Sequence, residues 1–529
     1  MTDVIEQQTD NQATEEKGTV QSRFPMMSPF QLFNLCLGIV GIQFAWSMQI
    51  ALSSRVLEPL GADPFLFGLI WCAGPVTGLL VQPIVGAISD RTWTKIGRRR
   101  PFFLIGAVLG AIALIIFPMS PTLLFAVFTI WIIDACVNIS QGPYRALVPD
   151  NVNPAQHAIA NGYINFAYGV GSVIALGTAP VLKFFNIEMT ITQQYIMSAI
   201  ALILFIVYTS LTIKEFKPVK KETQTQEKET LFDAFKVFLK SNKEIHKLCG
   251  AQFLMWIGIM CMFIYLTPFV VHNIYNLPDL STKQYKQIEK SYAANITPEQ
   301  VESVKPVTTQ YIKLLKEGKK DEIKTLLAAN NISNFDEELT KENSAATYKK
   351  FALMKQLDHE ATNTSQLAFV ALNLVSLILS IPLGYLCLKF GKKFVLTASL
   401  LFMIGAFSFA PVIATPAGVI TMMAFAGVGW ATILSIPYSI LCDYIPSGNE
   451  GSIMGIFNIF IAGPQLISAT LIGWIISQHP TNTVLGSSHN WSIAFISGAI
   501  CISVAIAALK FVKEKKNSST ELNACCAGH

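Results

Sequence analysis

The fold of this chain is decided by the stretch Leu123–Leu147, which reads LLFAVFTIWIIDACVNISQGPYRAL. The stretch is apolar and exceeds the roughly 20 residues that a helix needs to cross a bilayer. Asp134 lies close to its middle. Because a charge at the bilayer centre costs about 2.5–3.5 kcal/mol on insertion scales, such a residue usually faces a protein interior rather than lipid. The stretch therefore predicts a membrane helix packed within a bundle.

Three further polar residues share the helix face of Asp134. Asn138, Gln141 and Arg145 follow it at offsets of 4, 7 and 11 positions. A helix turns by about 100° per residue, so these offsets bring all four side chains to one face. We interpret this face as a polar stripe turned toward an interior. The alternative is a structural carboxylate tied to a neighbouring helix.

The composition is that of a membrane protein, because 52% of the residues are hydrophobic and only 14% are charged, against about 25% charged in soluble domains. Apolar windows long enough to cross a bilayer recur on both sides of a polar linker. We predict an all-α membrane protein with twelve transmembrane helices in two six-helix bundles. The predicted spans are 29–54, 64–89, 101–119, 122–147, 160–183 and 193–213, then 247–272, 365–388, 393–412, 414–441, 452–477 and 489–510.

Basic residues gather in alternate loops, as in Arg98–Arg100 after the second span and Lys389–Lys393 after the eighth. Short loops rich in Lys and Arg stay cytoplasmic, so we expect both termini in the cytoplasm and a plasma or inner membrane location. The net charge of +5 follows from this topology and does not indicate nucleic-acid binding. The predicted layout is a disordered tail (1–27), a first bundle (28–213), a cytoplasmic linker (214–244), a second bundle (245–513) and a second tail (514–529).

One polar segment, residues 273–364, interrupts the second bundle. It is rich in Lys and Glu, and the order of the spans puts it on the outer side of the membrane. Residues 308–317 and 321–329 have helical patterns, so the segment is either a small cap or a mobile loop. We expect it to be an accessory element.

The sequence has no nucleophile motif, metal-ligand cluster or phosphate-binding glycine loop, and we therefore expect neither an enzyme nor a bound cofactor or metal. The predicted spans also contain no histidine by our interpretation, which leaves a carboxylate as the only intramembrane proton carrier. We expect a monomer whose partners are a small-molecule sugar, a proton and membrane lipid.

The two halves carry a faint repeat. Pro143-Tyr144-x-x-Leu147 with the following Asp150 reappears as Pro437-Tyr438-x-x-Leu441 with Asp443, and Gly162-x-x-Asn165 reappears as Gly455-x-x-Asn458. The offset between the copies is 294 residues at the start and 293 at the end. Related bundles of this size are typical of transporters that work by alternating access, with the substrate site between the halves.

Residues 86–102, GAISDRTWTKIGRRRPF, resemble the signature loop of the major facilitator superfamily. The long form of the loop is similar to that of the plant sucrose/proton symporters and their animal and bacterial relatives, in the glycoside–pentoside–hexuronide:cation symporter group. GIQFAWSMQ at residues 41–49 and SIPY at residues 435–438 fit the same group. The resemblance covers all but the tails and the outer segment.

The resemblance implies sugar/proton symport, with Asp134 as the coupling carboxylate and Arg145 as its partner. The signature loop is expected to act as a conformational latch; the alternative is that its arginines only anchor the loop to anionic headgroups. Two departures stand out: Pro64 replaces a histidine of the plant carriers, and Leu388 replaces an acidic residue in the second signature loop. The latch residues are Gly86, Asp90, Arg91, Gly97, Arg98 and Arg99.

The candidate substrate-binding residues are amides and aromatics, which suit the hydroxyl groups and the CH face of a sugar. On the first span, Gln43 and Trp46 share a face and Gln49 lies somewhat off it. Any one of these side chains could instead serve helix packing. The set consists of Gln43, Trp46, Gln49, Asn138, Gln141, Asn165, Tyr168, Trp256, Asn373, Tyr438 and Asn458.

Three alternatives to proton-coupled sugar transport remain. A sodium-coupled or passive sugar carrier would have the same fold. A lipid or lysolipid transporter would need an apolar cavity open to the bilayer. A membrane sugar sensor or receptor would need a signalling domain, for which the cytoplasmic segments are too short.

Overall fold

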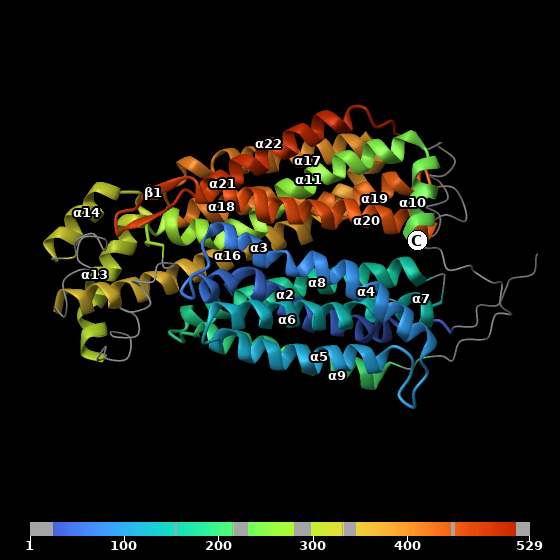
Figure 1. Cartoon of the computed structure of the whole chain (residues 1–529), viewed down its shortest axis with the longest axis horizontal. Coiled ribbons are helices and arrows are strands. Elements are labelled where there is room, and N and C mark those ends of the chain that lie inside the picture. Colours follow the sequence, from blue (N-terminus) through green and yellow to red (C-terminus); the bar gives the residue numbers. More distant parts are fainter. Residues whose placement is uncertain are drawn as a thin grey trace, which may run out of the picture.

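The computed structural model describes residues 25–145, 147–153, 156–213, 215, 231–279, 298–330, 332, 345–445 and 450–514. Twelve of its helices are long and apolar enough to cross a membrane. Six of these spans lie before residue 213 and six after residue 242, and the two groups lie side by side (Figure 1). The predicted all-α fold with twelve spans is confirmed.

The first half begins where Ser28 caps the first helix in a reciprocal bond with Gln31. The second span is broken in one place, at Cys72, after Asp63 and Pro64 start it. The elements of this half are α2 (Pro29–Leu57), α3 (Pro64–Trp71), α4 (Ala73–Arg91), α5 (Arg100–Ile116), η1 (Phe117–Met119), α6 (Leu123–Arg145), α7 (Leu147–Asn151), α8 (His157–Phe184) and α9 (Ile191–Thr212).

The second half starts with the short α10 (Leu231–Lys240), which packs on α20. Two of its spans are not regular α-helices throughout, because π turns follow α11 and α20. The further elements are α11 (Lys243–Pro268), η3 (Phe269–Ile274), α16 (Ala345–Phe390), α17 (Lys392–Ser408), η4 (Ala410–Val412), α18 (Pro416–Ile433), α19 (Ile436–Cys442), α20 (Glu450–Ile467), η5 (Ser468–Ile472), α21 (Gly473–Ser477), β1 (Pro480–Asn482), β2 (Ser487–His489) and α22 (Ser492–Leu509).

The outer segment contains α13 (Pro298–Lys316) and α14 (Lys320–Ala329), which lie beyond one end of the bundles (Figure 1). It also contains the first part of α16, which runs unbroken for 46 residues. At 1.5 Å per residue this helix is about 70 Å long, more than twice the apolar thickness of a bilayer. The eighth span therefore does not begin at residue 365 as predicted, because hydropathy detects only the apolar part of a longer helix.

α13 is fixed to this long helix and to the loop after η3. The hydroxyl of Tyr311 donates to the carbonyl of Tyr275 at 2.9 Å, and Thr308 donates to Gln356 of α16. Burial raises the pKa of the Tyr311 phenol above its ordinary value, so it remains a hydrogen-bond donor. The described part of the outer segment is thus a helical cap.

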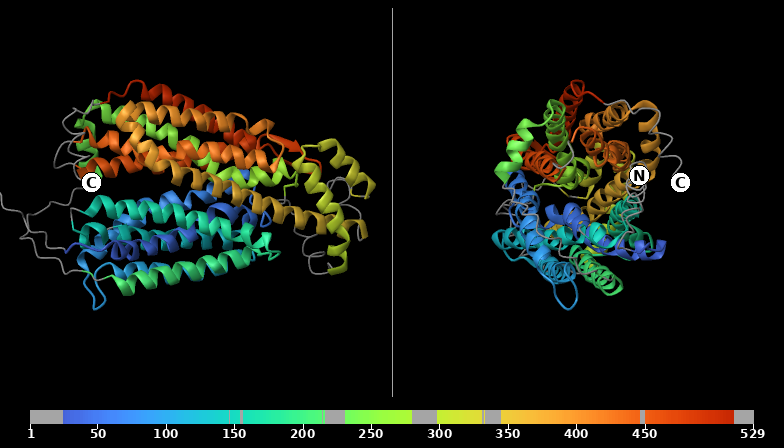
Figure 2. Two further views of the ribbon diagram at one scale, coloured as in Figure 1. Left: turned by 180° about the vertical axis from the view of Figure 1, so that it is seen from behind. Right: turned by 90° about the vertical axis from the view of Figure 1, so that its right-hand side faces the viewer.

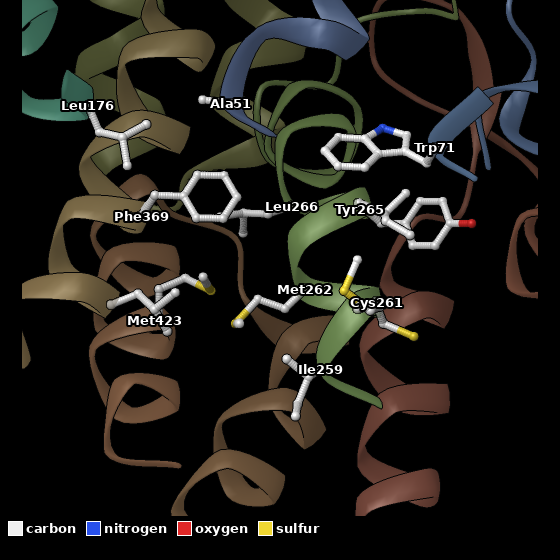
Figure 3. Packing of buried hydrophobic residues seen from close by; sticks show 14 of the residues in the cluster. Ala51, Trp71, Leu176, Ile259, Cys261, Met262, Tyr265, Leu266, Phe369 and Met423 are labelled. Atoms are coloured by element: carbon white, nitrogen blue, oxygen red, sulfur yellow. The ribbon is translucent and has the colours of Figure 1, made fainter. Parts of the chain in front are cut away.

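The two halves make their closest contacts toward this cap. α3 packs closely against η5 and α21. This approach requires glycine, because a Cβ at Gly68 would overlap the carbonyl oxygen of Ala469. Close by, Thr267 donates to the carbonyl of Ala51 at 3.0 Å. Figure 3 shows apolar side chains of both halves in one cluster, with Ala51 and Trp71 beside Tyr265 and Leu266.

Figure 2 shows the same two groups of helices from behind, with the cap beyond one end. Along the length of the bundles, α8 of the first half packs on α16 of the second. At the end away from the cap, the described segments are the signature loop, α7 and α10 (Figure 1). The candidate site lies between these two ends.

Candidate functional site

Asp134 is buried inside the first half, with 1% of its surface exposed. The Nε2 of Gln49 on α2 donates a hydrogen bond of 2.6 Å to its Oδ1. Its Oδ2 faces Gly74 of α4, where a Cβ would lie 3.9 Å from that oxygen and 3.8 Å from the ring of Trp46. The carboxylate is therefore enclosed by α2, α4 and α6. Gln49, which the helix pattern put off the polar face, is its contact.

The polar stripe continues from Asp134 as a chain of amides between helices. Asn138 donates from Nδ2 to Thr77 of α4 at 3.1 Å and to the backbone carbonyl of Asp134 at 2.9 Å. Its Oδ1 accepts from Gln82 of α4 at 2.5 Å. Thr77 and Gln82 were not among the predicted site residues. Their spacing indicates the site, because Thr77 and Gln82 lie close to the face of α4 that carries Gly74 and Gly78.

The stripe reaches α8 through Gln141, which donates to the hydroxyl of Tyr168 at 3.0 Å. α8 also contacts α2, because the Nε2 of Gln43 donates to the hydroxyl of Ser172 at 2.7 Å. The helices approach closely here, since a Cβ at Gly171 would lie 2.9 Å from the Cβ of Gln43. The amides of the first half thus bind one another and the buried carboxylate.

The candidates of the second half do not form one cluster. The amide of Asn373 donates to the carbonyl of Phe369 in its own helix, and Tyr438 donates to Asn458 at 2.6 Å in an exposed position. Trp256 packs edge-on against Trp430, with ring centroids 6.2 Å apart. Asn373, Tyr438 and Asn458 therefore already have partners within their own half.

Gln252 lies one turn before Trp256 on α11 and is fully buried. Within the described part of the chain, neither its Nε2 nor its Oε1 has a hydrogen-bond partner, and the Nε1 of Trp256 and the Oε1 of Gln49 have none either. Buried polar atoms in proteins are nearly always paired, so such groups are candidates for binding a ligand. Gln252 was not among the predicted site residues, although it lies four positions before Trp256 and therefore on the same face of α11.

The signature loop is organised by two acids of the first half. Glu215 accepts hydrogen bonds from the backbone N–H groups of Arg98, Arg99 and Arg100 at 2.7, 2.9 and 3.0 Å. This turn requires Gly97 in the left-handed region, at φ 125°. Asp150 binds the guanidinium groups of Arg98 and Arg99, each at 2.8 Å.

The second half repeats this arrangement. Glu514 accepts from the backbone N–H groups of Lys392 and Lys393 at 2.6 and 3.2 Å, after Gly391 at φ 91°. The ammonium group of Lys392 binds Asp443 at 2.8 Å. Arg98 and Lys392 are separated by 294 positions and Asp150 and Asp443 by 293, the same offsets as the sequence repeat. Each of these loops is closed within its own half.

The side chains of Asp90, Arg91, Arg145 and Asn165 lie outside the described part of the structure. Gly86 is described, and a Cβ there would meet nothing within 4 Å, so close packing does not require a glycine at this position.

The prediction that no histidine lies within a span is wrong. His272 is fully buried at the end of the seventh span, which extends through η3 as Lys243–Ile274. The π turn continues the helix beyond Pro268, so the last turn of the span carries a polar ring into the interior.

These features define a multi-pass integral membrane protein built from two related six-helix halves with a polar stripe inside one of them. A family model described as Major Facilitator Superfamily matches residues 35–288 and 349–524. The chain belongs to the major facilitator superfamily. The unmatched stretch between the two matches lies within the outer segment.

Known relatives agree with this membership. A general alpha-glucoside permease of Schizosaccharomyces pombe is 25% identical over 514 residues, covering 87% of this chain and 89% of that protein. A sucrose transport protein of Arabidopsis thaliana is 32% identical over 205 residues, covering 34% of this chain and 40% of that protein. The resemblance to this group of permeases, suggested by the signature loop, is confirmed.

Solved structures show the same fold. The nucleoside transporter NupG superposes with a TM-score of 0.57 at 13% identity, covering 92% of this chain and all of that one. A bacterial homologue of the human lysosomal transporter Spinster gives 0.54 at 12% identity, covering 92% of this chain and 97% of that one. At these identities the likeness concerns the fold alone.

Proposed function

We propose that this protein carries a sugar of the glucoside or disaccharide class across the membrane together with a proton. The observation that carries the proposal is the similarity along almost the whole chain to an alpha-glucoside permease. The shorter similarity to a plant sucrose transport protein supports the same substrate class.

The chemistry of the buried groups suits a neutral, hydroxylated substrate. Gln49 and Gln252 have amide atoms without a protein partner in the described part of the chain, and so does the indole N–H of Trp256. An amide offers both donors and acceptors, which matches the two roles of a sugar hydroxyl. The adjacent Trp256 and Trp430 provide aromatic faces for the CH side of a sugar ring.

Coupling is assigned to Asp134. Its burial in a membrane helix means that the ionised carboxylate is costly to enclose, whereas the protonated form is neutral. Gln49 can donate to either form from Nε2, so the hydrogen bond to Oδ1 survives a change of protonation. The loaded carrier would then enclose a neutral acid and a neutral sugar.

Transport is proposed to occur by alternating access, with both termini in the cytoplasm. In the described conformation the halves are joined toward the outer cap by the crossing of α3 with η5 and α21. In the opposite conformation these contacts would part, and the ends of the halves near the signature loops would meet. The membrane is proposed to be a plasma or inner membrane.

The test uses the purified protein in sealed liposomes with labelled maltose, sucrose and glucose. An inward proton gradient should drive accumulation of at least one α-glucoside, and collapse of the gradient should return it to equilibrium. Accumulation driven only by sodium, or equilibration with no response to either gradient, would overturn proton coupling. Movement of labelled lipid without any sugar flux would overturn the substrate class.

A further inference from the structure

A second cluster of buried charged groups joins the two halves below the cap. Arg55 and Glu58 end α2 in the first half, and their side chains form an ion pair of 2.6 Å. Arg55 also binds Asp358 of α16, and the Nε2 of His272 lies 3.2 Å from the same oxygen of Glu58. The side chains of Arg55, Glu58 and His272 are at most 2% exposed, and that of Asp358 is 28% exposed.

The surroundings of the His272 ring hold a proton between the ring and the carboxyl group of Glu58 in this conformation. Its Nδ1 lies 3.0 Å from the carbonyl oxygen of Leu277, and its Nε2 faces the carboxylate of Glu58. Neutral imidazole has one N–H, whereas imidazolium has two. Either the imidazolium donates to both oxygens, or a neutral ring donates from Nδ1 to Leu277 and accepts at Nε2 from a protonated Glu58; both arrangements place one dissociable proton on the His272–Glu58 pair. The ring also stacks on Trp491, with centroids 5.6 Å apart and planes at 16°, where a cation is favoured.

The charge balance of the cluster leads to the same result. Glu58 and Asp358 supply two negative charges, and Arg55 supplies one positive charge. One proton on the His272–Glu58 pair makes the cluster neutral, whereas its loss leaves a net negative charge in a buried site. Uncompensated buried charge is strongly destabilising, by about 3–5 kcal/mol when one partner of a pair is removed.

The other elements around His272 add one ion pair. Asp279 follows η3 and binds His489 of β2 at 2.9 Å. The facing parts of α11 and α18 carry no charged residue. Two further imidazoles lie near the junction: His489, and His359 of α16, whose Nε2 lies 3.2 Å from the carbonyl oxygen of Met189 in the first half. Both serve as controls.

The cluster exists because the halves are closed at this end. Arg55 and Glu58 belong to the first half, and Asp358 and His272 belong to the second. Other bonds across the same junction join Lys183 to Glu360 and Gln366 to Gln194. Separating the halves at this end would remove His272 from Glu58 and Arg55 from Asp358.

We propose that His272 and Glu58 form a second proton-binding site, distinct from Asp134, whose occupancy stabilises closure of the two halves beneath the cap. The proposal rests on the alternating access proposed above. By linkage, a proton that binds the closed conformation more tightly must shift the equilibrium toward closure. Acid on the capped side favours the closed form, and loss of the proton at higher pH favours opening.

The test measures the distance between the halves by pulsed electron spin resonance on the full chain in lipid nanodiscs. Spin labels are attached at Ile187→Cys and Val412→Cys, both at exposed positions near the cap. Cys442, Cys525 and Cys526 are replaced by serine to remove competing labels. The background carries Asp134→Asn, so titration of the proposed coupling residue does not contribute.

The ratio of closed to open conformations should fall about tenfold or more between about pH 5.5 and about pH 8.5, on either side of the usual imidazole range. His272→Gln should abolish this pH dependence, and Glu58→Gln should reduce it. His272→Lys, which keeps a permanent positive charge, should hold the closed form at both pH values. His489→Gln and His359→Gln should each leave the response unchanged.

A ratio that does not change with pH would overturn the proposal, and so would a pH response that persists in both His272→Gln and Glu58→Gln. If His272→Gln fails to fold, Glu58→Gln and His272→Lys still decide the outcome. Because no sugar is present and Asp134 is already neutralised, failure here is distinguishable from failure of sugar/proton coupling in the liposome assay.

Discussion

At the scale of single residues, Asp134 is defined by its enclosure. The Gln49 amide binds one oxygen, and Gly74 leaves room for the other beside Trp46. Asp134→Asn keeps the size of the side chain but removes its acidity. We expect the variant to lose gradient-driven accumulation of sugar while it retains exchange of labelled for unlabelled sugar in liposomes. Accumulation with the pH dependence of the unmodified protein would instead assign a structural role to Asp134.

The buried amide of Gln252 gives a prediction on affinity. If its unpaired atoms bind a sugar hydroxyl, Gln252→Ala should weaken the apparent affinity for sugar by about tenfold, equivalent to about 1.4 kcal/mol. The matched control is Asn373→Ala, because that amide bonds its own helix. Competition binding measures both. Equal effects of the two substitutions would remove Gln252 from the site.

The sequence predicted polar residues within one helix better than their partners across helices. Asp134, Asn138 and Gln141 follow from the repeat of a single helix. The bonds from Gln49 to Asp134 and from Gln82 to Asn138 depend on how α2 and α4 cross α6. That crossing is a matter of packing between helices, which the periodicity of a single helix does not contain.

At the scale of elements, one of the two acids at each signature loop, Glu215 or Glu514, binds the backbone of the loop. Glu215→Gln removes the charge that three backbone N–H groups share, so we expect a loss of about 1–2 kcal/mol and slower transport with little change in sugar binding. Glu514→Gln in the second half is the matched variant and should have a similar effect. Thermal unfolding and binding measurements check both. A large loss of affinity would mean that the loop reaches the binding site.

The spans themselves were predictable because about 20 apolar residues leave few alternatives in a bilayer. The breaks within them were not. Cys72 interrupts the second span and π turns extend the seventh and the eleventh, without any change in hydropathy. His272 is the last residue of the predicted span 247–272, so the sequence already contained an imidazole at the end of this span; the π turn carries the span on to Ile274.

At the scale of the whole molecule, the balance between the two conformations should respond to charge pairs across the junction of the halves. Lys183 of α8 binds Glu360 of α16 close to the cap. Lys183→Glu should open this side and raise the rate at which a probe cysteine introduced at Ala51 is labelled from outside, since this buried residue lies at the junction. Both side chains are about a quarter exposed, so the effect should be modest, about 1 kcal/mol or less.

Reversal of both charges supplies the control for that experiment. Lys183→Glu combined with Glu360→Lys restores the attraction with exchanged signs and should return the labelling rate toward that of the unmodified protein. A double variant that remains as open as the single one would show that the pair does not contribute to closure.

In the orientation proposed above, α16 connects the cap on the outer side of the membrane to the junction between the two halves. This helix begins in the cap and ends at Phe390. Its residues Asp358 and Glu360 bind the first half at the junction. We expect an antibody fragment that binds the exposed side of α13, which packs on this helix, to arrest the carrier without entering the sugar pathway. Such an inhibitor would be non-competitive with sugar, and its potency would not fall as the sugar concentration rises.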